Sequence, residues 1–492
     1  MPTAIESLRE RLFDVNALQT AATVMDWDQQ TYMPKGASEA RAHHMSTLTR
    51  MAHEQFTADD TRKWAEDAVA ETEDDVAWLR LVRRKLNLAT KLPSQLVAEK
   101  THAGAIGHDL WVEARKANDF ARFAPQLERL FDICRQEAEL YGYQDDIYDA
   151  LLDTYEEGAT AAEVRAMFAA IKQPQIDLIE RIKACGPVDD SWLYGNWAQD
   201  SQRQITEYYL RAVGYDFERG RQDTAAHPFC TSFSVTDVRV TTRYTNYLPG
   251  SIMSTLHEAG HAMYEQGSPV AWDRTLLAGG ASLGVHESQS RLWENIVGRS
   301  MAFWAWGFGR IVQAFPALAE RSATEFQRAI NKVEPSLIRV EADELTYNLH
   351  IMIRFELESE ILKGQLKVAD LPAAWNAKYQ AYLGITPDSD ANGCLQDVHW
   401  SGGSVGYFPT YTMGNLLSYQ IWNRMRKDVG DTDMRITRGE FAPILQWLRE
   451  HMYQYGSKFA PKDLVVKVTG KPMDPTEYLD GLQAKYTALY HL

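Results

Sequence analysis

Residues 251–266, SIMSTLHEAGHAMYEQ, decide how the middle of this chain folds. Apolar side chains, among them Leu256 and Met263, recur there every three or four residues, which is the period of an amphipathic helix. Ser251 is a suitable N-cap residue, and Gly267, which a proline follows two residues later, is suited to end the helix. We therefore predict a helix over residues 251–266.

This predicted helix contains His257-Glu258-Ala259-Gly260-His261, which fits the pattern H-E-x-x-H. Because the two histidines are four residues apart, both imidazoles project from one face and can reach one Zn²⁺. Glu258 lies beside that metal position and is suited to take a proton from a bound water, and Gly260 lets another segment approach closely. The alternative interpretation is two histidines packed in a helical core, where burial without partners is costly.

A catalytic zinc needs a third protein ligand and one open coordination position. Another helix is predicted from about residue 282 to beyond residue 293, and Glu287 on it is the preferred third ligand. Glu294, which Arg291 is placed to pair with, and Glu265 are the alternatives. A site with two histidines and one glutamate suits metal-assisted hydrolysis, since zinc lowers the pKa of a bound water towards 7 and polarises a carbonyl.

Composition excludes several other classes of protein. The chain has 492 residues and a net charge of −16, which disfavours nucleic acid as a partner because phosphate backbones are repelled. Its four cysteines are far apart with no CxxC pair, which argues against a thiolate zinc site and a disulfide framework. No run of about 18 apolar residues and no signal-peptide pattern occurs, so we expect a cytoplasmic protein without a membrane partner.

The rest of the chain predicts a mainly helical protein with one small β element. Residues 229–247 are rich in β-branched residues that nearly alternate, which indicates a short hairpin or small sheet. Residues 322–363 predict a long helix or a pair of helices, and residues 391–412, rich in Gly, Ser and aromatics, predict a long ordered loop. We expect one unit over residues 1–492, with a possible N-terminal helical subdomain over 1–120 and a catalytic core over 220–415.

Six short signatures stand in a fixed order along the chain, and together they identify a family. They are His227-Pro228-Phe229, Asp237-x-Arg239-x-Thr241, the HEAGH run, His286-Glu287-Ser288-Gln289, Ile338-Arg339-x-x-Ala342-Asp343, and Gly393-x-x-Gln396-Asp397-x-His399-Trp400. With these signatures, the sequence resembles the carboxypeptidase Taq family of zinc metallocarboxypeptidases from about residue 8 to the C-terminus. Residues 25–34, MDWDQQTYMP, resemble the family as well.

The resemblance implies a large helical zincin-like domain with a deep active-site groove, which the N-terminal subdomain covers. It implies release of single amino acids from peptides with a free C-terminus, with broad specificity and little action next to proline. It implies a homodimer with one Zn²⁺ per chain, which Co²⁺ can replace. The family pattern carries over His257, His261 and Glu287 as metal ligands, and Glu258 as the general base and acid that activates the zinc-bound water.

A carboxypeptidase must recognise a terminal carboxylate, and a bidentate arginine is the usual means. Arg339 is the preferred anchor and Arg239 the other candidate, since each belongs to a signature. The alternatives are a surface salt bridge of Arg339 with Glu341 or Asp343, and a local Asp237–Arg239 contact.

The oxyanion of the reaction needs donors besides the metal. His399 with Tyr407 or Tyr411 is suited to that role, and His227 and Gln289 are weaker candidates for substrate contacts. Asp343 is expected to orient a ligand histidine through its second ring nitrogen. The alternatives are that His399 only packs its loop, that His227 makes a structural hydrogen bond, and that Asp343 is an ordinary surface aspartate.

Other functions stay open on sequence alone. A zinc endopeptidase or a dipeptide-releasing carboxypeptidase would share the HEAGH run and Glu287, and an aminopeptidase would use acidic residues to hold an N-terminal amine. A helical binding protein with a structural zinc is a third class, but such sites usually have four protein ligands, often cysteines.

Overall fold

Helices make up 69% of the chain in the computed structural model, which describes residues 2–492. The helices are α1 (Ala4–Thr31), α2 (Ser38–Thr57), α3 (Asp59–Asp67), α4 (Glu73–Lys91), α5 (Ser94–Ala117), α6 (Phe120–Tyr141), α7 (Ile147–Leu152), α8 (Ala161–Lys183), α9 (Gln199–Val213), α10 (Leu248–Gln266), α11 (Leu283–Arg291), α12 (Met301–Ala314), α13 (Ala323–Ile330), α14 (Tyr347–Leu362), α15 (Leu371–Leu383), α16 (Pro409–Val429), α17 (Thr432–Thr437), α18 (Ala442–His451), α19 (Pro461–Thr469) and α20 (Thr476–Tyr490). The prediction of a mainly helical protein is confirmed.

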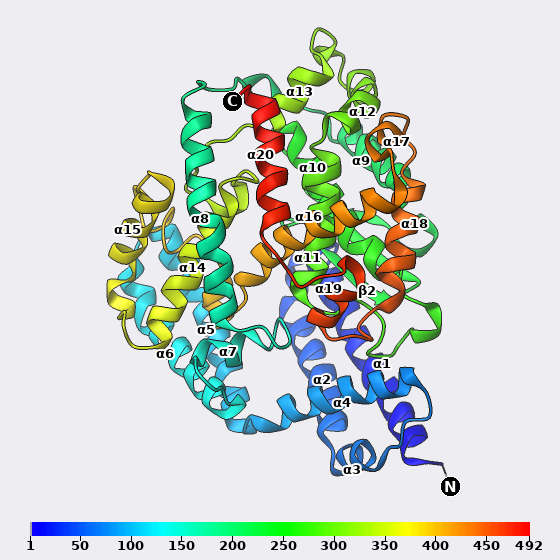
Figure 1. The fold of residues 1–492 in the computed structure, drawn as a ribbon. Helices are drawn as coiled ribbons and strands as arrows, with labels where there is room; N and C mark the ends of the chain where they lie inside the picture. The colour runs from blue at the N-terminus through cyan, green and yellow to red at the C-terminus, as the bar shows by residue number, and fades with distance from the viewer. Residues whose placement is uncertain (1) are drawn as a thin grey trace.

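Three main hydrophobic clusters, with a small fourth between α5 and α6, hold together the helices that Figure 1 shows. One cluster joins α1 to α4, at the bottom of the view, and also takes in Leu277. A second lies among α5 to α8, α14, α15 and α20, and a third lies among α9 to α13, the sheet and α17 to α19. Helix α16 contributes to both large clusters, with Leu416 in the second and Leu417 in the third. The first cluster ends with α4, and the division of the chain at residue 120 stays a prediction.

The sheet is small and lies against α10. Strands β2 (Cys230–Ser234) and β3 (Asp237–Thr242) form the predicted hairpin, and β1 (Gln222–Thr224), which sequence reasoning missed, pairs with β3 in parallel. The strand order is β1-β3-β2. The Thr242 hydroxyl bonds Ser251 and Ser254 of α10, so the sheet is fixed to that helix.

Two expected boundaries differ in the structure. Helix α10 begins at Leu248, so Ser251 lies inside the helix and does not cap it. Pro249 stands in the first turn, where a missing amide hydrogen costs nothing, so the helix includes residues before the predicted start at residue 251. Residues 322–363 form the pair α13 and α14, and the predicted loop 391–412 gives way to α16 at Pro409.

Helix α11 is held between α10 and α16 by two close approaches. A Cβ atom at Gly260 of α10 would lie 2.3 Å from the Gln289 carbonyl oxygen of α11. On the other side, a Cβ atom at Gly414 of α16 would lie 2.6 Å from Cβ of Glu287. Both glycines therefore permit backbone distances that no other residue allows, as was expected for Gly260.

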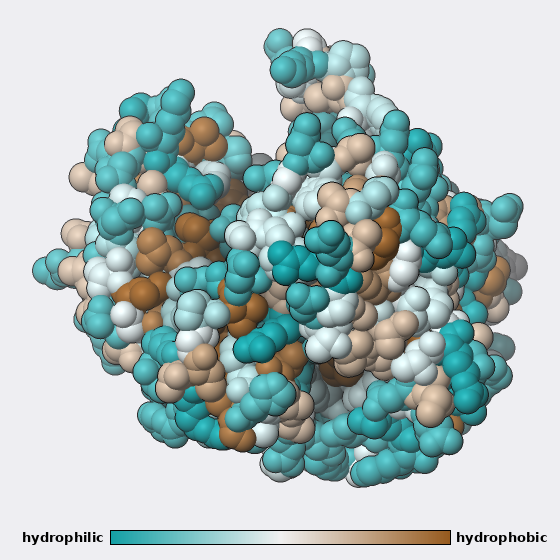
Figure 2. Space-filling model, turned by 90° about the horizontal axis from the view of Figure 1, so that it is seen from above, coloured by the Kyte–Doolittle hydropathy of each residue, from teal (hydrophilic) through white to brown (hydrophobic). Residues whose placement is uncertain are grey.

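The surface carries many hydrophilic side chains, in keeping with the 24% of charged residues in the sequence. Hydrophilic side chains dominate the face shown in Figure 2, and a notch separates two lobes of that face. Among residues 2–492, no helix combines the length and the apolar character that crossing a bilayer requires. Cys134, Cys185, Cys230 and Cys394 are all free.

Candidate metal centre and active site

The three predicted metal ligands lie together where α10 meets α11. Nε2 of His257 is 3.6 Å and Nε2 of His261 is 3.4 Å from Oε2 of Glu287. Ligands about 2.0–2.1 Å from a tetrahedral Zn²⁺ stand about 3.3 Å from one another, so this spacing fits the ion. Within residues 2–492 no other group of His, Cys, Asp and Glu brings three such atoms within 4.8 Å.

The other ring nitrogen of each histidine has a partner that fixes the ring. Nδ1 of His257 is 2.9 Å from Oε2 of Glu294, and Nδ1 of His261 is 2.6 Å from Nδ1 of His286. His286 in turn places Nε2 2.7 Å from Oε1 of Glu265. Glu294 and Glu265, the alternative third ligands, thus act one layer behind the ligands, an arrangement that orients imidazoles at metal sites.

Arg291 determines how Glu287 presents its carboxylate. Its Nε donates to Oε1 of Glu287 at 2.6 Å, while Oε2 faces the histidines. Burial acts to raise the pKa of Glu287, but Arg291 and the two histidines hold it well below its usual range. Glu287 is therefore a charged candidate ligand, whose Oε2 accepts from the Ser290 hydroxyl at 3.0 Å and keeps a further lone pair for a metal.

Glu258 lies beside the predicted ligands with 6% of its surface exposed. Burial raises the pKa of this carboxyl to about 7, opposed by His257 and reinforced by Glu287. A carboxyl group with that affinity for protons can both take up and return one near neutral pH.

Arg339 is buried beside a second ionic cluster. Its Nε and Nη2 donate to Oδ1 of Asp397 at 3.0 and 2.8 Å, and Nη1 donates to the Tyr347 hydroxyl at 2.8 Å. Arg354 donates to the other oxygen of Asp397 at 2.6 Å. Arg339 therefore pairs neither with Glu341 nor with Asp343, and one N–H on each Nη atom is left for another acceptor.

His399, Tyr407 and Tyr411 lie on the loop that leads into α16 and on its first turn. Their rings contact one another, with His399 and Tyr407 5.3 Å apart at the ring centres. Burial raises the pKa values of both tyrosines, and the charge of Glu287 adds to the shift. The Tyr411 ring packs edge-on against Tyr347, over which Arg291 stacks at 4.6 Å. Burial lowers the pKa of His399 to about 4, and Nδ1 of its ring is buried without a hydrogen-bond partner. His227 lies close enough to contribute to that shift.

Two residues expected to contact the substrate, Arg239 and Gln289, form hydrogen bonds with other parts of the protein instead. Arg239 forms the local contact considered as its alternative, with two 2.8 Å bonds to Asp237, and it stacks on Trp27 of α1. The Gln289 amide is fully buried and contacts Tyr453 and Met452, because it projects from the side of α11 away from the metal ligands.

Asp343, expected to orient a ligand histidine, bonds backbone amides instead. Its carboxylate accepts bonds from the backbone of Glu334, Leu345 and Thr346, before α14 begins. It therefore stabilises the loop before α14. The ring nitrogens that Asp343 was expected to bond are bonded by Glu294 and His286. Sequence reasoning missed these two partners, although both stand on the predicted helix and carry side chains able to bond imidazole.

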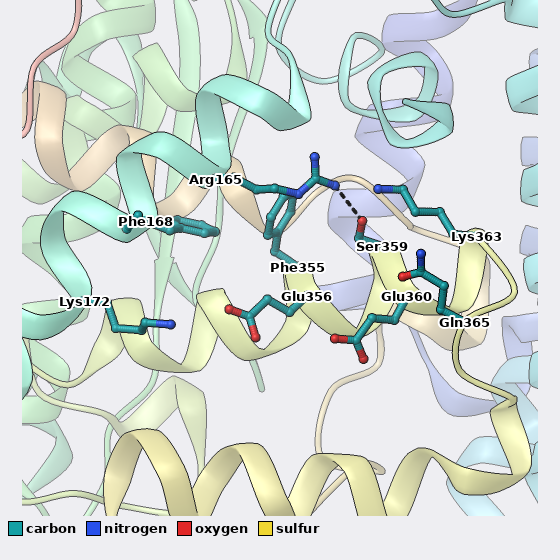
Figure 3. A pocket seen from close by; sticks show the side chains of 10 residues that line it. Arg165, Phe168, Lys172, Phe355, Glu356, Ser359, Glu360, Lys363 and Gln365 are labelled. Carbon is teal, nitrogen blue, oxygen red and sulfur yellow. Dashed lines mark hydrogen bonds between the residues drawn. The ribbon is translucent and has the colours of Figure 1, made fainter. Parts of the chain in front are cut away.

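A pocket of about 350 Å³ lies apart from this centre, between α8 and α14 (Figure 3). Arg165 and Lys363 on its wall both donate to Asp146, and Arg165 also donates to Ser359. Lys378 likewise neutralises the two glutamates of the wall. No predicted site residue lines this pocket, so we do not assign the active site to it.

Comparisons with known proteins show the family to which the chain belongs. The family model described as carboxypeptidase Taq (M32) metallopeptidase matches residues 7–486. Thermostable carboxypeptidase 1 of Thermus thermophilus is 41% identical, with 99% of each chain covered, and carboxypeptidase 1 of Bacillus subtilis is 39% identical, with 99% of this chain and 100% of that protein covered.

Solved structures are similar over the same length. The M32 carboxypeptidase of Deinococcus radiodurans superposes with a TM-score of 0.98 at 39% identity, covering 100% of both chains. Metallocarboxypeptidase 1 of Trypanosoma cruzi superposes with a TM-score of 0.94 at 33% identity, covering 98% of this chain and 99% of that one.

We expect Arg291→Gln to weaken metal binding about 10-fold or more, because Glu287 then loses the cation that fixes Oε1 and is free to rotate. Competition with a chromogenic chelator measures the dissociation constant. Arg165→Gln is the matched control, since Arg165 pairs with Asp146, apart from the metal centre. Equal metal affinity in wild type and Arg291→Gln would show that Glu287 needs no such support.

Proposed function

Because the chain belongs to the carboxypeptidase Taq (M32) family and is a metallocarboxypeptidase, we propose that it releases single amino acids from the free C-terminus of peptides. The proposal includes broad specificity, poor action next to proline, and one Zn²⁺ per chain, which Co²⁺ can replace. The observation that carries it is the cluster of His257, His261 and Glu287 with Glu258 buried alongside.

The proposed roles follow from the geometry. His257, His261 and Glu287 hold the ion, which when bound polarises the scissile carbonyl and makes water more acidic. Glu258 takes the proton from the attacking water and returns it to the leaving amine. Tyr407, Tyr411 and His399 supply hydrogen bonds to the charge that develops on the carbonyl oxygen.

Arg339 is the proposed anchor for the terminal carboxylate. Asp397 and Tyr347 fix the guanidinium in position, and the remaining N–H on each Nη can donate to one oxygen of a bidentate carboxylate. Arg239 is the weaker candidate, since Asp237 occupies its fork and Trp27 covers its face. His227 stays a candidate for a substrate contact, and burial, followed by the charges of Arg243 and Arg339, lowers its pKa.

We predict that a peptide with a free C-terminus is shortened one residue at a time, whereas its amidated twin is not. Chelation should abolish the reaction, and added Zn²⁺ or Co²⁺ should restore it, because the metal supplies the Lewis acid. Mass spectrometry of paired digests measures both effects.

Each alternative function has its own outcome in this experiment. Internal cleavage of both peptides indicates an endopeptidase, and loss of two residues at a time indicates a dipeptide-releasing enzyme. Shortening from the N-terminus indicates an aminopeptidase. One equivalent of bound metal without any cleavage indicates a binding protein.

We expect Glu258→Gln to bind one metal ion per chain as wild type does and to lose about 10²–10⁴-fold in kcat, because the amide cannot take up the proton. Metal content and turnover measured on the same sample separate the two effects. Turnover at the wild-type rate would remove Glu258 from the mechanism.

Arg339→Lys should lower kcat/KM for free-carboxylate peptides about 10-fold or more, since lysine cannot form the bidentate contact. The matched control is Arg354→Lys, which disturbs the same Asp397 cluster from a fully buried position. If Arg339 holds the terminal carboxylate, only Arg339→Lys reduces the preference for free over amidated peptides. An equal loss of preference in both variants would assign the effect to the cluster.

The homodimer and the cytoplasmic location stay predictions. Sedimentation in solution tests the first, and fractionation of cells tests the second.

A further inference from the structure

Glu156 is a buried carboxylate outside the site described above. It lies on residues 153–158, the turn between α7 and α8, and only 3% of its surface is exposed. Its Oε1 accepts from the Ser282 hydroxyl at 2.7 Å and its Oε2 from the Gly284 amide at 2.9 Å. Burial raises its pKa to about 7, and within residues 2–492 no Lys, Arg or His forms a salt bridge with it.

Ser282 and Gly284, which donate to Glu156, stand at the start of α11. The first amides of a helix have no partner inside the helix and need one from elsewhere. Here the Leu283 amide donates to the Tyr155 carbonyl, the Gly284 amide to Glu156, and the Val285 amide to the Ser282 hydroxyl that Glu156 accepts from. Residues 155 and 156 therefore determine where α11 begins.

The beginning of α11 in turn determines where Glu287 lies. Glu287 follows Gly284 by three residues, about 4.5 Å along the axis of a rigid helix. Glu287 lies only one helical turn from this start, so a shift of the first turn of α11 is carried to the candidate ligand. Helix α11 continues directly into a π-helical segment over Leu292–Gly298. A Cβ at Gly284 would lie 2.8 Å from Oε2 of Glu156, which shows how closely the turn and the helix meet.

The turn 153–158 also contacts helix α4 and the loop before α16. Arg80 and Arg84 of α4 form salt bridges with Glu157 and Asp153, both at 2.8 Å. On the side of the loop before α16, the Tyr155 ring packs edge-on against Tyr407, with centres 5.3 Å apart. The same turn thus contacts the N-terminal helices, the ligand helix and a tyrosine proposed to hydrogen-bond the oxyanion.

We propose that Glu156 is a positioning residue for the metal centre, which holds the first turn of α11 against the turn 153–158 and thereby places Glu287 for metal binding. The inference rests on the proposed function in so far as Glu287 is a metal ligand. Glu156 touches neither metal nor substrate and acts only through the backbone of α11.

Two substitutions at this position separate its hydrogen bonds from its charge. Glu156→Ala removes both acceptors from the start of α11. Glu156→Gln keeps both contacts, because the amide oxygen accepts from Gly284 and the amide nitrogen donates to the Ser282 hydroxyl. Asp149→Ala is the matched control: Asp149 bonds the Ala161 amide at the start of α8 at 2.6 Å, and that helix carries no predicted site residue.

The experiment measures the dissociation constant for Zn²⁺ by chelator competition, and kcat and KM on a peptide with a free C-terminus, for full-length folded variants. We expect Glu156→Ala to weaken Zn²⁺ binding about 10-fold or more and to lower kcat of the metal-saturated enzyme with KM nearly unchanged. Glu156→Gln should stay within about threefold of wild type in each quantity, and Asp149→Ala should leave Zn²⁺ binding unchanged even where it lowers the melting temperature.

Wild-type Zn²⁺ affinity in Glu156→Ala would overturn the proposal, as would an equal loss of affinity in Asp149→Ala. Should Glu156→Ala fail to fold, Gly284→Ala replaces it, because the added methyl displaces the carboxylate from α11: weaker Zn²⁺ binding supports the proposal and wild-type binding overturns it. Failure of the proposed function has a different result: the wild-type protein binds Zn²⁺ but releases no C-terminal residue. In that case the Zn²⁺ affinities of the variants still test whether Glu156 positions Glu287.

Discussion

The close packing of α11 between α10 and α16 is the constraint on which the centre depends. Gly260 lets the α11 backbone approach the helix that carries both histidines, and Gly414 lets α16 approach Glu287 from the other side. Only at this separation does the Glu287 carboxylate come within 3.4 and 3.6 Å of the imidazoles. Side chains larger than hydrogen at either glycine would separate the helices, because protein interiors have no spare volume.

A second constraint is the burial of charge around the ligands. Glu287 is buried and Glu294 is only 12% exposed, yet their neighbours hold the pKa values of both carboxyls well below the usual range. Burying two negative charges is costly unless cations compensate them. Arg291 contacts both carboxylates and Arg299 contacts Glu294, so the charges lie in a fixed alternating arrangement. Such a preorganised set of charges holds ligands in place before the metal arrives, which reduces the cost of binding it.

The site combines parts of the two large hydrophobic clusters. The candidate metal ligands come from α10 and α11, which pack in one cluster, whereas Arg339, His399 and the tyrosines come from segments that pack in the other. Helix α16 joins the clusters and carries Tyr411 on its first turn. The fold therefore brings a metal-binding half and a candidate substrate-binding half together at one interface.

Local sequence was sufficient wherever the chemistry lies within one or two helical turns. The spacing of His257 and His261 alone places both rings on one face, since the period of the helix is fixed by backbone geometry. The six signatures likewise indicated the family, and a mainly helical fold with a small hairpin followed. Tertiary structure alone decided which partner each charged group takes: Glu294 and not Asp343 holds His257, and Asp397 holds Arg339 across 58 residues of chain. These pairings depend on how distant elements pack, and a spacing along the chain contains no information about such distances.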